Sequence, residues 1–206
     1  MVFRASQIGK LMTNPRKKSE DLSETAKSYI RQLAKQDFYG YESDISTKQI
    51  RKGIHYENES IKLLNEVRET KHEKNTERRF NDFVTGEPDI ITISSIIDIK
   101  TSWSLESFPA TSSEGESSLH EWQLRAYMWL FEKPSAELIY CMIDTDDEFL
   151  NDYDNLMIHK VSHIKPCKRI TVLNYTRDTM KEDMMSERLK ICSDYYSQYI
   201  NQLNNK

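Results

Sequence analysis

The stretch GEPDIITISSIIDIKT, residues 86–101, decides the fold of this chain because it places charged residues beside and inside two β-branched apolar runs. Two serines separate the runs at residues 90–93 and 96–99, and this pattern predicts a tight hairpin. Asp89 then begins one strand and Asp98 ends the other, so the two carboxylates become neighbours in space. A buried charge costs several kcal/mol unless it is paired or bound to a metal, so these residues ask for a chemical explanation.

Carboxylates that gather at one place indicate a cation site. Glu57, Asp89 and Asp98 would repel one another unless a hard divalent cation such as Mg²⁺ bound them, and oxygen ligands favour magnesium or manganese over zinc. Lys100 follows Asp98 by two residues and therefore shares its face of the strand, while Ile99 points into the core and offers its backbone carbonyl to the metal. A pair of such ions polarises a phosphodiester, and the lysine can orient the attacking water.

The rest of the chain alternates helical and strand patterns. Glu57 belongs to an amphipathic helix expected over residues 46–67, in which Glu59 is an acidic alternative to it. The other expected elements are helices over 7–13, 22–36, 118–133 and 176–203, a loop over 104–118, a strand over 136–144 and two strands within 156–175. This order predicts an α/β fold with a mixed β-sheet flanked by helices, in one domain over residues 1–206.

The composition is that of a soluble protein, with 37% hydrophobic and 30% charged residues. No run approaches the roughly 18 apolar residues of a membrane span, so we expect a cytoplasmic protein without a membrane partner. A net charge of −4 argues against a nucleic-acid partner. Basic residues nevertheless cluster at 14–20 and 47–53, while acidic residues cluster at 143–155. A basic groove on one side of the protein can therefore coexist with an acidic surface on the other side.

Several motifs occur together in one order. GEPD and IDIKT precede Gln123 and Tyr127, which are four residues apart in WQLRAYMWL, and this set resembles the PD-(D/E)xK nuclease superfamily with its restriction-endonuclease-like fold. With RASQIGKLM and GIHYENES upstream, the chain looks more narrowly like the YqaJ-type viral recombinases, the family of the phage lambda exonuclease. The resemblance covers most of residues 3–132.

That resemblance implies a phage or prophage nuclease that works in the bacterial cytoplasm. Members degrade one strand of linear double-stranded DNA from its 5′ end and leave a 3′ overhang for a single-strand annealing recombinase. They use Mg²⁺, with two ions per site, for which Mn²⁺ can substitute, and lambda-like members form toroidal homotrimers. Relatives with an iron–sulfur cluster need four cysteines, and this chain has three, so no such cluster is expected.

The resemblance also assigns roles to residues outside the carboxylate set. Gln123 and Tyr127 would position DNA or the catalytic lysine, although the same pair could simply satisfy hydrogen bonds in a buried helix. Arg4, Ser6 and Arg125 are candidates for gripping the 5′ phosphate, because a guanidinium fits phosphate oxygens. For Arg4 and Ser6 an ordinary helix start is nearly as good an explanation.

Two other functions remain open. The same fold and metal site also serve structure-specific endonucleases and DNA repair nucleases. Neither the fold nor the metal site determines the polarity of strand degradation or the DNA substrate. A catalytically inactive DNA-binding recombination scaffold is the alternative outside the enzymes. The intact Asp89, Asp98 and Lys100 argue against that scaffold, because decayed sites usually lose a metal ligand first.

Overall fold

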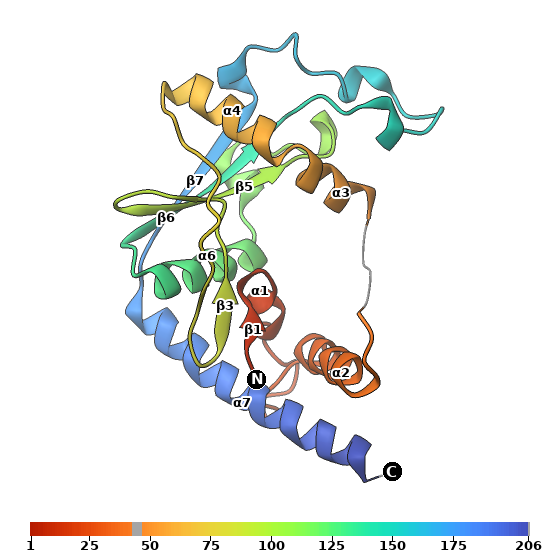
Figure 1. Cartoon of the computed structure of the whole chain (residues 1–206), viewed down its shortest axis with the longest axis vertical. Helices are drawn as coiled ribbons and strands as arrows, with labels where there is room; N and C mark the ends of the chain where they lie inside the picture. Colours follow the sequence, from red (N-terminus) through yellow and green to blue (C-terminus); the bar gives the residue numbers. More distant parts are fainter. Residues whose placement is uncertain (43–46, 206) are drawn as a thin grey trace.

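Two mixed β-sheets and the helices that flank them make up the computed structural model, which describes residues 1–42 and 47–205 (Figure 1). The larger sheet has the strand order β4-β5-β6-β7. These strands are β4 (Ile90–Ile91), β5 (Ser95–Thr101), β6 (Ser135–Cys141) and β7 (Ile170–Thr176). β5 and β6 run parallel, and the two outer pairs are antiparallel. The predicted α/β fold is therefore confirmed.

The predicted hairpin is present, with a shorter first strand. Ile90 pairs with Ile97, and the turn closes where the Thr92 backbone N–H donates to the Ser95 carbonyl over 2.9 Å. Asp98 lies within β5 and does not end it, contrary to the expectation. The strand continues to Thr101 because its other edge pairs with β6 along its whole length.

The smaller sheet joins the N-terminus to the segment before the hairpin. Its strands are β1 (Phe3–Arg4), β3 (Val84–Gly86) and β2 (Arg79–Phe80), in the order β1-β3-β2. A 3₁₀ turn (Ala5–Gln7) and the short helix α1 (Ile8–Leu11) follow β1. The small sheet thus places residues 3–11 beside the segment that leads to Asp89 and β4.

The single helix expected over residues 46–67 is wrong. Two helices, α3 (Lys48–His55) and α4 (Glu57–Arg68), meet at Tyr56, whose φ of −100° and ψ of 16° interrupt the helical ladder. The Tyr56 ring is buried, and its hydroxyl accepts a 2.9 Å hydrogen bond from the Asp146 backbone N–H. This tertiary contact fixes the break and leaves Glu57 in the first turn of α4.

The two strands expected within residues 156–175 are also wrong, because only β7 forms there. The segment before it makes 3₁₀ turns at Leu156–Ile158 and Pro166–Lys168. Pro166 has no backbone N–H to give to a sheet, which is consistent with a turn at that point. Likewise, the expected loop over 104–118 contains short helical turns at Leu105–Ser107 and at α5 (Ser112–Gly115).

The larger sheet is covered on both faces (Figure 1). α6 (Ser118–Phe131) packs on the face that includes Ile96, and α4 packs on the face that includes Ile97 and Ile99. Because side chains alternate along a strand, Asp98 and Lys100 share the α6 face with Ile96, as predicted. The helices α2 (Glu24–Tyr39) and α7 (Thr179–Asn204) pack beside each other around α1, as Figure 1 shows. No described helix is long and apolar enough to cross a membrane.

Candidate active site

A cavity of about 480 Å³ opens over the second half of β5. Residues from α3, α4, β5 and α6 surround it, and these lining residues are Gln49, Ile50, Gly53, Ile54, Glu57, Asp89, Ile99, Lys100, Thr101 and His120. Of the predicted set, Glu57, Asp89, Ile99 and Lys100 therefore share one cavity. Glu59 is not among these residues and pairs instead with Lys62.

Asp98 lies just beneath this cavity and is 2% exposed. Its Oδ1 accepts a 3.1 Å hydrogen bond from Gln123 Nε2. Its Oδ2 lies 2.8 Å from Lys100 Nζ in an ion pair, and this buried oxygen has no other partner among the described residues. A buried carboxylate oxygen with spare acceptor capacity is what a metal ligand needs.

Asp89 completes the pair of neighbouring carboxylates. Its Oδ2 accepts a hydrogen bond from the Ile99 backbone N–H, and its own carbonyl accepts one of 2.7 Å from Asn75. Burial, together with the Asp98 charge, raises the pKa of Asp89 to about 8. The N–H and C=O of a strand residue point to the same side, so the Ile99 carbonyl also faces Asp89, beyond the end of β4.

The cationic side of the site consists of two lysines. Burial lowers the pKa of Lys100, but the carboxylates of Asp98, Asp89 and Glu57 outweigh burial and raise it overall. Lys74 Nζ lies 2.8 Å from Glu57 Oε2, and the pKa of Lys74 is raised by that contact. Lys74 comes from the charged segment after α4, in which the sequence pattern marked no site residue.

Gln123 and Tyr127 form a chain of hydrogen bonds behind the carboxylates. Lys100 Nζ donates to Gln123 Oε1 over 3.2 Å, and Gln123 Nε2 donates to the Tyr127 hydroxyl over 3.1 Å. That hydroxyl donates in turn to the Glu87 carbonyl over 3.3 Å. Burial, reinforced by the Asp98 charge, raises the pKa of Tyr127 far above its ordinary value. Gln123 contacts the carboxylate site, and Tyr127 supports Gln123.

The three residues predicted to grip a 5′ phosphate are not together. Arg4 and Ser6 line a second cavity of about 590 Å³, which Lys10 and Tyr29 also line. The Arg125 guanidinium is buried and donates through Nε and Nη2 to Glu121 Oε1, at 2.9 and 2.6 Å. Arg125 does not line that cavity, and its pairing with Glu121 makes a structural role the simpler interpretation.

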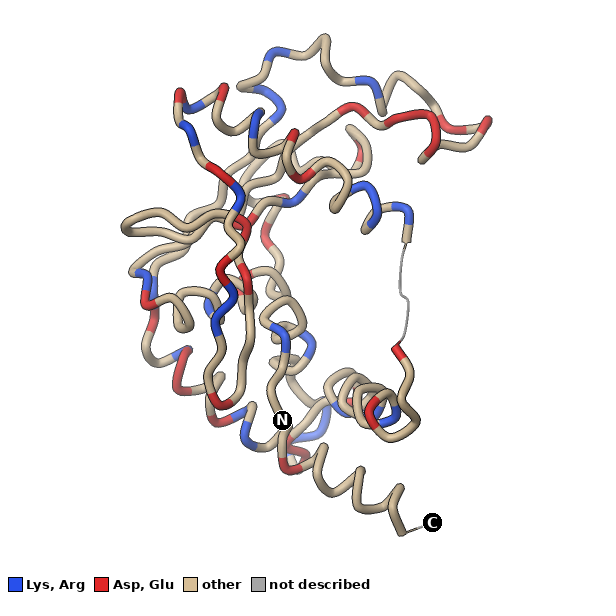
Figure 2. Tube along the Cα trace, in the orientation of Figure 1, with Lys and Arg blue, Asp and Glu red and all other residues tan. Residues whose placement is uncertain are grey.

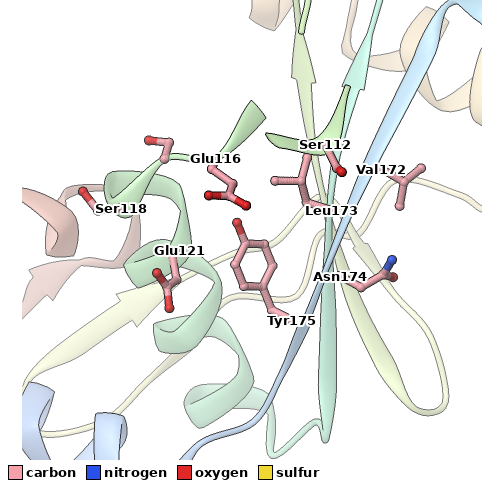
Figure 3. Close-up of a pocket in the computed structure, with 9 residues that line it drawn as sticks. Ser112, Glu116, Ser118, Glu121, Val172, Leu173, Asn174 and Tyr175 are labelled. Atoms are coloured by element: carbon pink, nitrogen blue, oxygen red, sulfur yellow. The ribbon is translucent and has the colours of Figure 1, made fainter. Parts of the chain in front are cut away.

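A third cavity, of about 790 Å³, contains none of the predicted residues. It lies along the outer side of β7 and is lined by Glu116, Glu121 and Tyr175 among others (Figure 3). Neither Asp89 nor Asp98 takes part in it, so its size does not make it the candidate active site. An exposed group formed by His55, Asp146 and Glu148 brings its ligand atoms within 4.8 Å of one another, but its members are surface residues.

The charges are distributed unevenly over the chain (Figure 2). Figure 2 shows acidic residues concentrated in the segment after β6 and basic residues on α3, the helix that contributes residues to the cavity lining. Arg51 is exposed there, and Lys48 is half-buried. The basic cluster predicted at residues 47–53 thus lies at the rim of the candidate site.

The chain matches no family model and no curated protein sequence. Among solved structures, a phage-related exonuclease from Haemophilus somnus 129PT is 32% identical, with 98% of this chain and 96% of that chain covered and a TM-score of 0.92. The alkaline exonuclease LHK-Exo from Laribacter hongkongensis is 11% identical over 99% of this chain and 92% of that chain, with a TM-score of 0.71. LHK-Exo in complex with dAMP gives a TM-score of 0.68 at 12% identity, with the same coverage. At these lower identities the likeness to LHK-Exo concerns the fold.

Proposed function

Because this chain belongs to the family of phage-related exonucleases similar to lambda exonuclease, we propose that it is a metal-dependent exonuclease acting on linear double-stranded DNA. It would remove nucleotides from the 5′ end and leave 3′ single-stranded overhangs for recombination. The observation that carries the proposal is the cavity that gathers Glu57, Asp89 and Lys100 above the buried Asp98.

The donor set fits a divalent cation. Asp89, Asp98 and the Ile99 carbonyl would hold Mg²⁺, with Glu57 completing the site, and Mn²⁺ could replace it. We propose two ions per site. When bound, the cations would polarise the phosphodiester and lower the pKa of coordinated water. Lys74, now paired with Glu57, would have to release that carboxylate when the metal site is filled.

Lys100 would act on the attacking water. Its ammonium is held between Asp98 and Gln123, so it meets the substrate in a fixed position. Gln123 in turn is fixed by Tyr127, so the two α6 residues would position the lysine and Asp98 without touching DNA. Orienting groups of this kind lower the barrier because the reacting geometry is prepared before binding.

The cavity of Arg4 and Ser6 is the proposed 5′-phosphate site. An arginine and a hydroxyl offer the donors that a phosphate monoester needs, and Lys10 adds a second cation nearby. Arg125 is the weaker candidate for this role because Glu121 already accepts from two of its nitrogens.

The remaining proposals concern the biological setting. Residues 1–206 would act as one nuclease domain in the cytoplasm of a bacterial host, encoded by a phage or prophage. We propose a homotrimer that works with a single-strand annealing recombinase. Sedimentation of the purified chain would test the trimer directly.

One experiment separates this function from its alternatives. The purified protein is incubated in Mg²⁺ with 5′-phosphorylated linear duplex, 5′-hydroxyl linear duplex and covalently closed circular DNA, and Asp98→Ala is the control. Loss of the phosphorylated linear strand alone supports a 5′ exonuclease. Cutting of the circle would instead indicate an endonuclease on the same fold. DNA binding without cleavage, and without Mg²⁺ binding in calorimetry, would indicate an inactive scaffold.

A further inference from the structure

His120 is the one imidazole that lines the candidate active-site cavity among the described residues. It lies on α6, three residues before Gln123, so both side chains project from one side of the helix. The sequence motifs gave it no role. In the structure it shares the cavity with Asp89 and Lys100, which makes its hydrogen-bonding state relevant to the reaction.

The neighbours of His120 determine which of its nitrogens carries the proton. His120 Nδ1 lies 3.0 Å from the Tyr140 hydroxyl, and this hydroxyl lies 3.0 Å from the Gly115 carbonyl. A carbonyl can only accept, so the single phenolic proton of Tyr140 is directed to Gly115. Tyr140 must therefore accept from His120, which places the proton on Nδ1 and leaves a lone pair on Nε2.

His120 lines the cavity, and its Nε2 lone pair is left for a partner from outside the protein. It has no hydrogen-bond partner within residues 1–42 and 47–205, and it is not among the atoms that are both buried and unpartnered. Burial, with the nearby Lys100 charge, lowers the pKa of His120 to about 4, so the ring is neutral at neutral pH. His120 thus presents a neutral acceptor in a cavity that otherwise holds carboxylates and an ammonium.

We propose that His120 Nε2 accepts a hydrogen bond from the water that attacks the phosphodiester. The inference rests on the proposed nuclease function. Phosphate oxygens are acceptors, and the internal sugars of DNA have no hydroxyl, so the backbone of the substrate offers no hydrogen to Nε2. Water is the donor that the reaction itself requires. One O–H directed at Nε2 would leave an oxygen lone pair of that water for the phosphorus, with Lys100 on the same cavity wall.

The first test compares two substitutions that differ in the atom at issue. His120→Phe keeps a planar ring and removes both nitrogens, whereas the Gln side chain can place an amide oxygen near the position of Nε2. We expect His120→Phe to lower kcat by about 10- to 100-fold with KM within about twofold, and His120→Gln to recover much of that loss. His163→Phe, on an exposed imidazole, is the matched control and should leave kcat unchanged.

A second readout does not depend on activity. Nitrogen-15 NMR of the wild-type imidazole should report a protonated Nδ1 at neutral pH, and Tyr140→Phe should relax this preference and lower kcat. A proton found on Nε2 overturns the inference. An unchanged kcat in a folded His120→Phe protein also overturns it. A rise in KM with kcat unchanged overturns it as well, because that result would indicate a contact between His120 and DNA. A wild-type protein that cleaves no DNA would overturn the proposed function together with this role.

Discussion

Lys100 Nζ donates a 3.2 Å hydrogen bond to Gln123 Oε1, so a residue of α6 holds the lysine of β5 in place. The same amide donates through Nε2 to Asp98. Gln123 therefore contacts both members of an ion pair at the base of the cavity, Lys100 through Oε1 and Asp98 through Nε2. The amide can make these contacts only because Asp98 and Lys100 face the same side of the strand.

Replacing Gln123 by Leu should separate positioning from binding. The variant would leave Asp98 Oδ1 without its donor and let Lys100 move, so we expect kcat to fall about 10- to 100-fold while DNA affinity changes little. Single-turnover cleavage and fluorescence anisotropy measure the two quantities. Gln202→Leu, on an exposed part of α7, is the control. Full activity in folded Gln123→Leu would show that Lys100 needs no such support.

Gly86 lets Tyr127 approach β3. A Cβ built on Gly86 would lie 2.7 Å from Tyr127 Cε1 and 2.9 Å from Ala5 Cβ, which is closer than real contacts allow. Gly86→Ala should therefore destabilise the fold by about 1–3 kcal/mol and disturb the chain from Tyr127 to Gln123. Chemical denaturation and cleavage rates measure the two effects.

Gly53→Ala is the control for the denaturation measurement, because nothing lies within 4 Å of the Cβ that it adds. Gly53 is inside α3, where alanine should raise stability by about 0.5–1 kcal/mol. A Gly86→Ala protein as stable as the wild type would mean that the Tyr127 ring can shift without cost.

The sequence was sufficient for the site where local patterns determine geometry. Period-two alternation places Asp98 beside Lys100, and helical spacing places Gln123 beside Tyr127, so both pairs could be predicted. The hairpin brings Asp89 to Ile99 for the same reason. These are short-range relationships, and they carry most of the fold around β5.

The features that the sequence did not reveal depend on distant contacts. The break at Tyr56 depends on a hydrogen bond with Asp146, ninety residues away in the chain. The protonation of His120 follows from Tyr140 and Gly115, and the pairing of Lys74 with Glu57 follows from the path of the chain after α4. Periodicity contains no information about such partners, because tertiary packing selects them.

Asp89 should couple metal binding to pH. Its pKa in the metal-free protein is raised to about 8 from an ordinary value of 3.8, so the native state holds this proton more tightly than the unfolded state does. The contribution of Asp89 to stability therefore falls as pH rises from about 4 to about 8. Mg²⁺ needs the ionised carboxylate, so its affinity should rise over the same range.

Calorimetry in buffers of different ionisation enthalpy tests this coupling. At pH 7, binding of Mg²⁺ should release close to one proton, and at pH 9 almost none. Release of no proton at pH 7 would show that Asp89 is already ionised or does not bind the metal. Thermal unfolding of the metal-free protein between pH 5 and pH 8 should show the matching loss of stability.

Lys52 ties α3 to the ends of β5 and β6. It is fully buried, and its Nζ donates to the carbonyls of Trp103 and Ile143 over 2.9 and 3.2 Å. Lys52→Met would leave both carbonyls without this donor, and we expect a loss of about 2–4 kcal/mol in the free energy of unfolding at neutral pH. Lys62→Met, on the exposed side of α4, should change it by less than about 0.5 kcal/mol.

The pH dependence of this lysine gives a sharper signature than the size of the loss. Burial lowers the pKa of Lys52 to about 8 from an ordinary value of 10.5. Between these values the unfolded state binds the proton more tightly, so the contribution of Lys52 to stability rises as pH increases from about 8 to about 10.5. Urea unfolding at pH 8 and pH 10 should show this contribution in the wild type and lose it in Lys52→Met. Identical pH profiles for the two proteins would mean that Lys52 titrates like an exposed lysine.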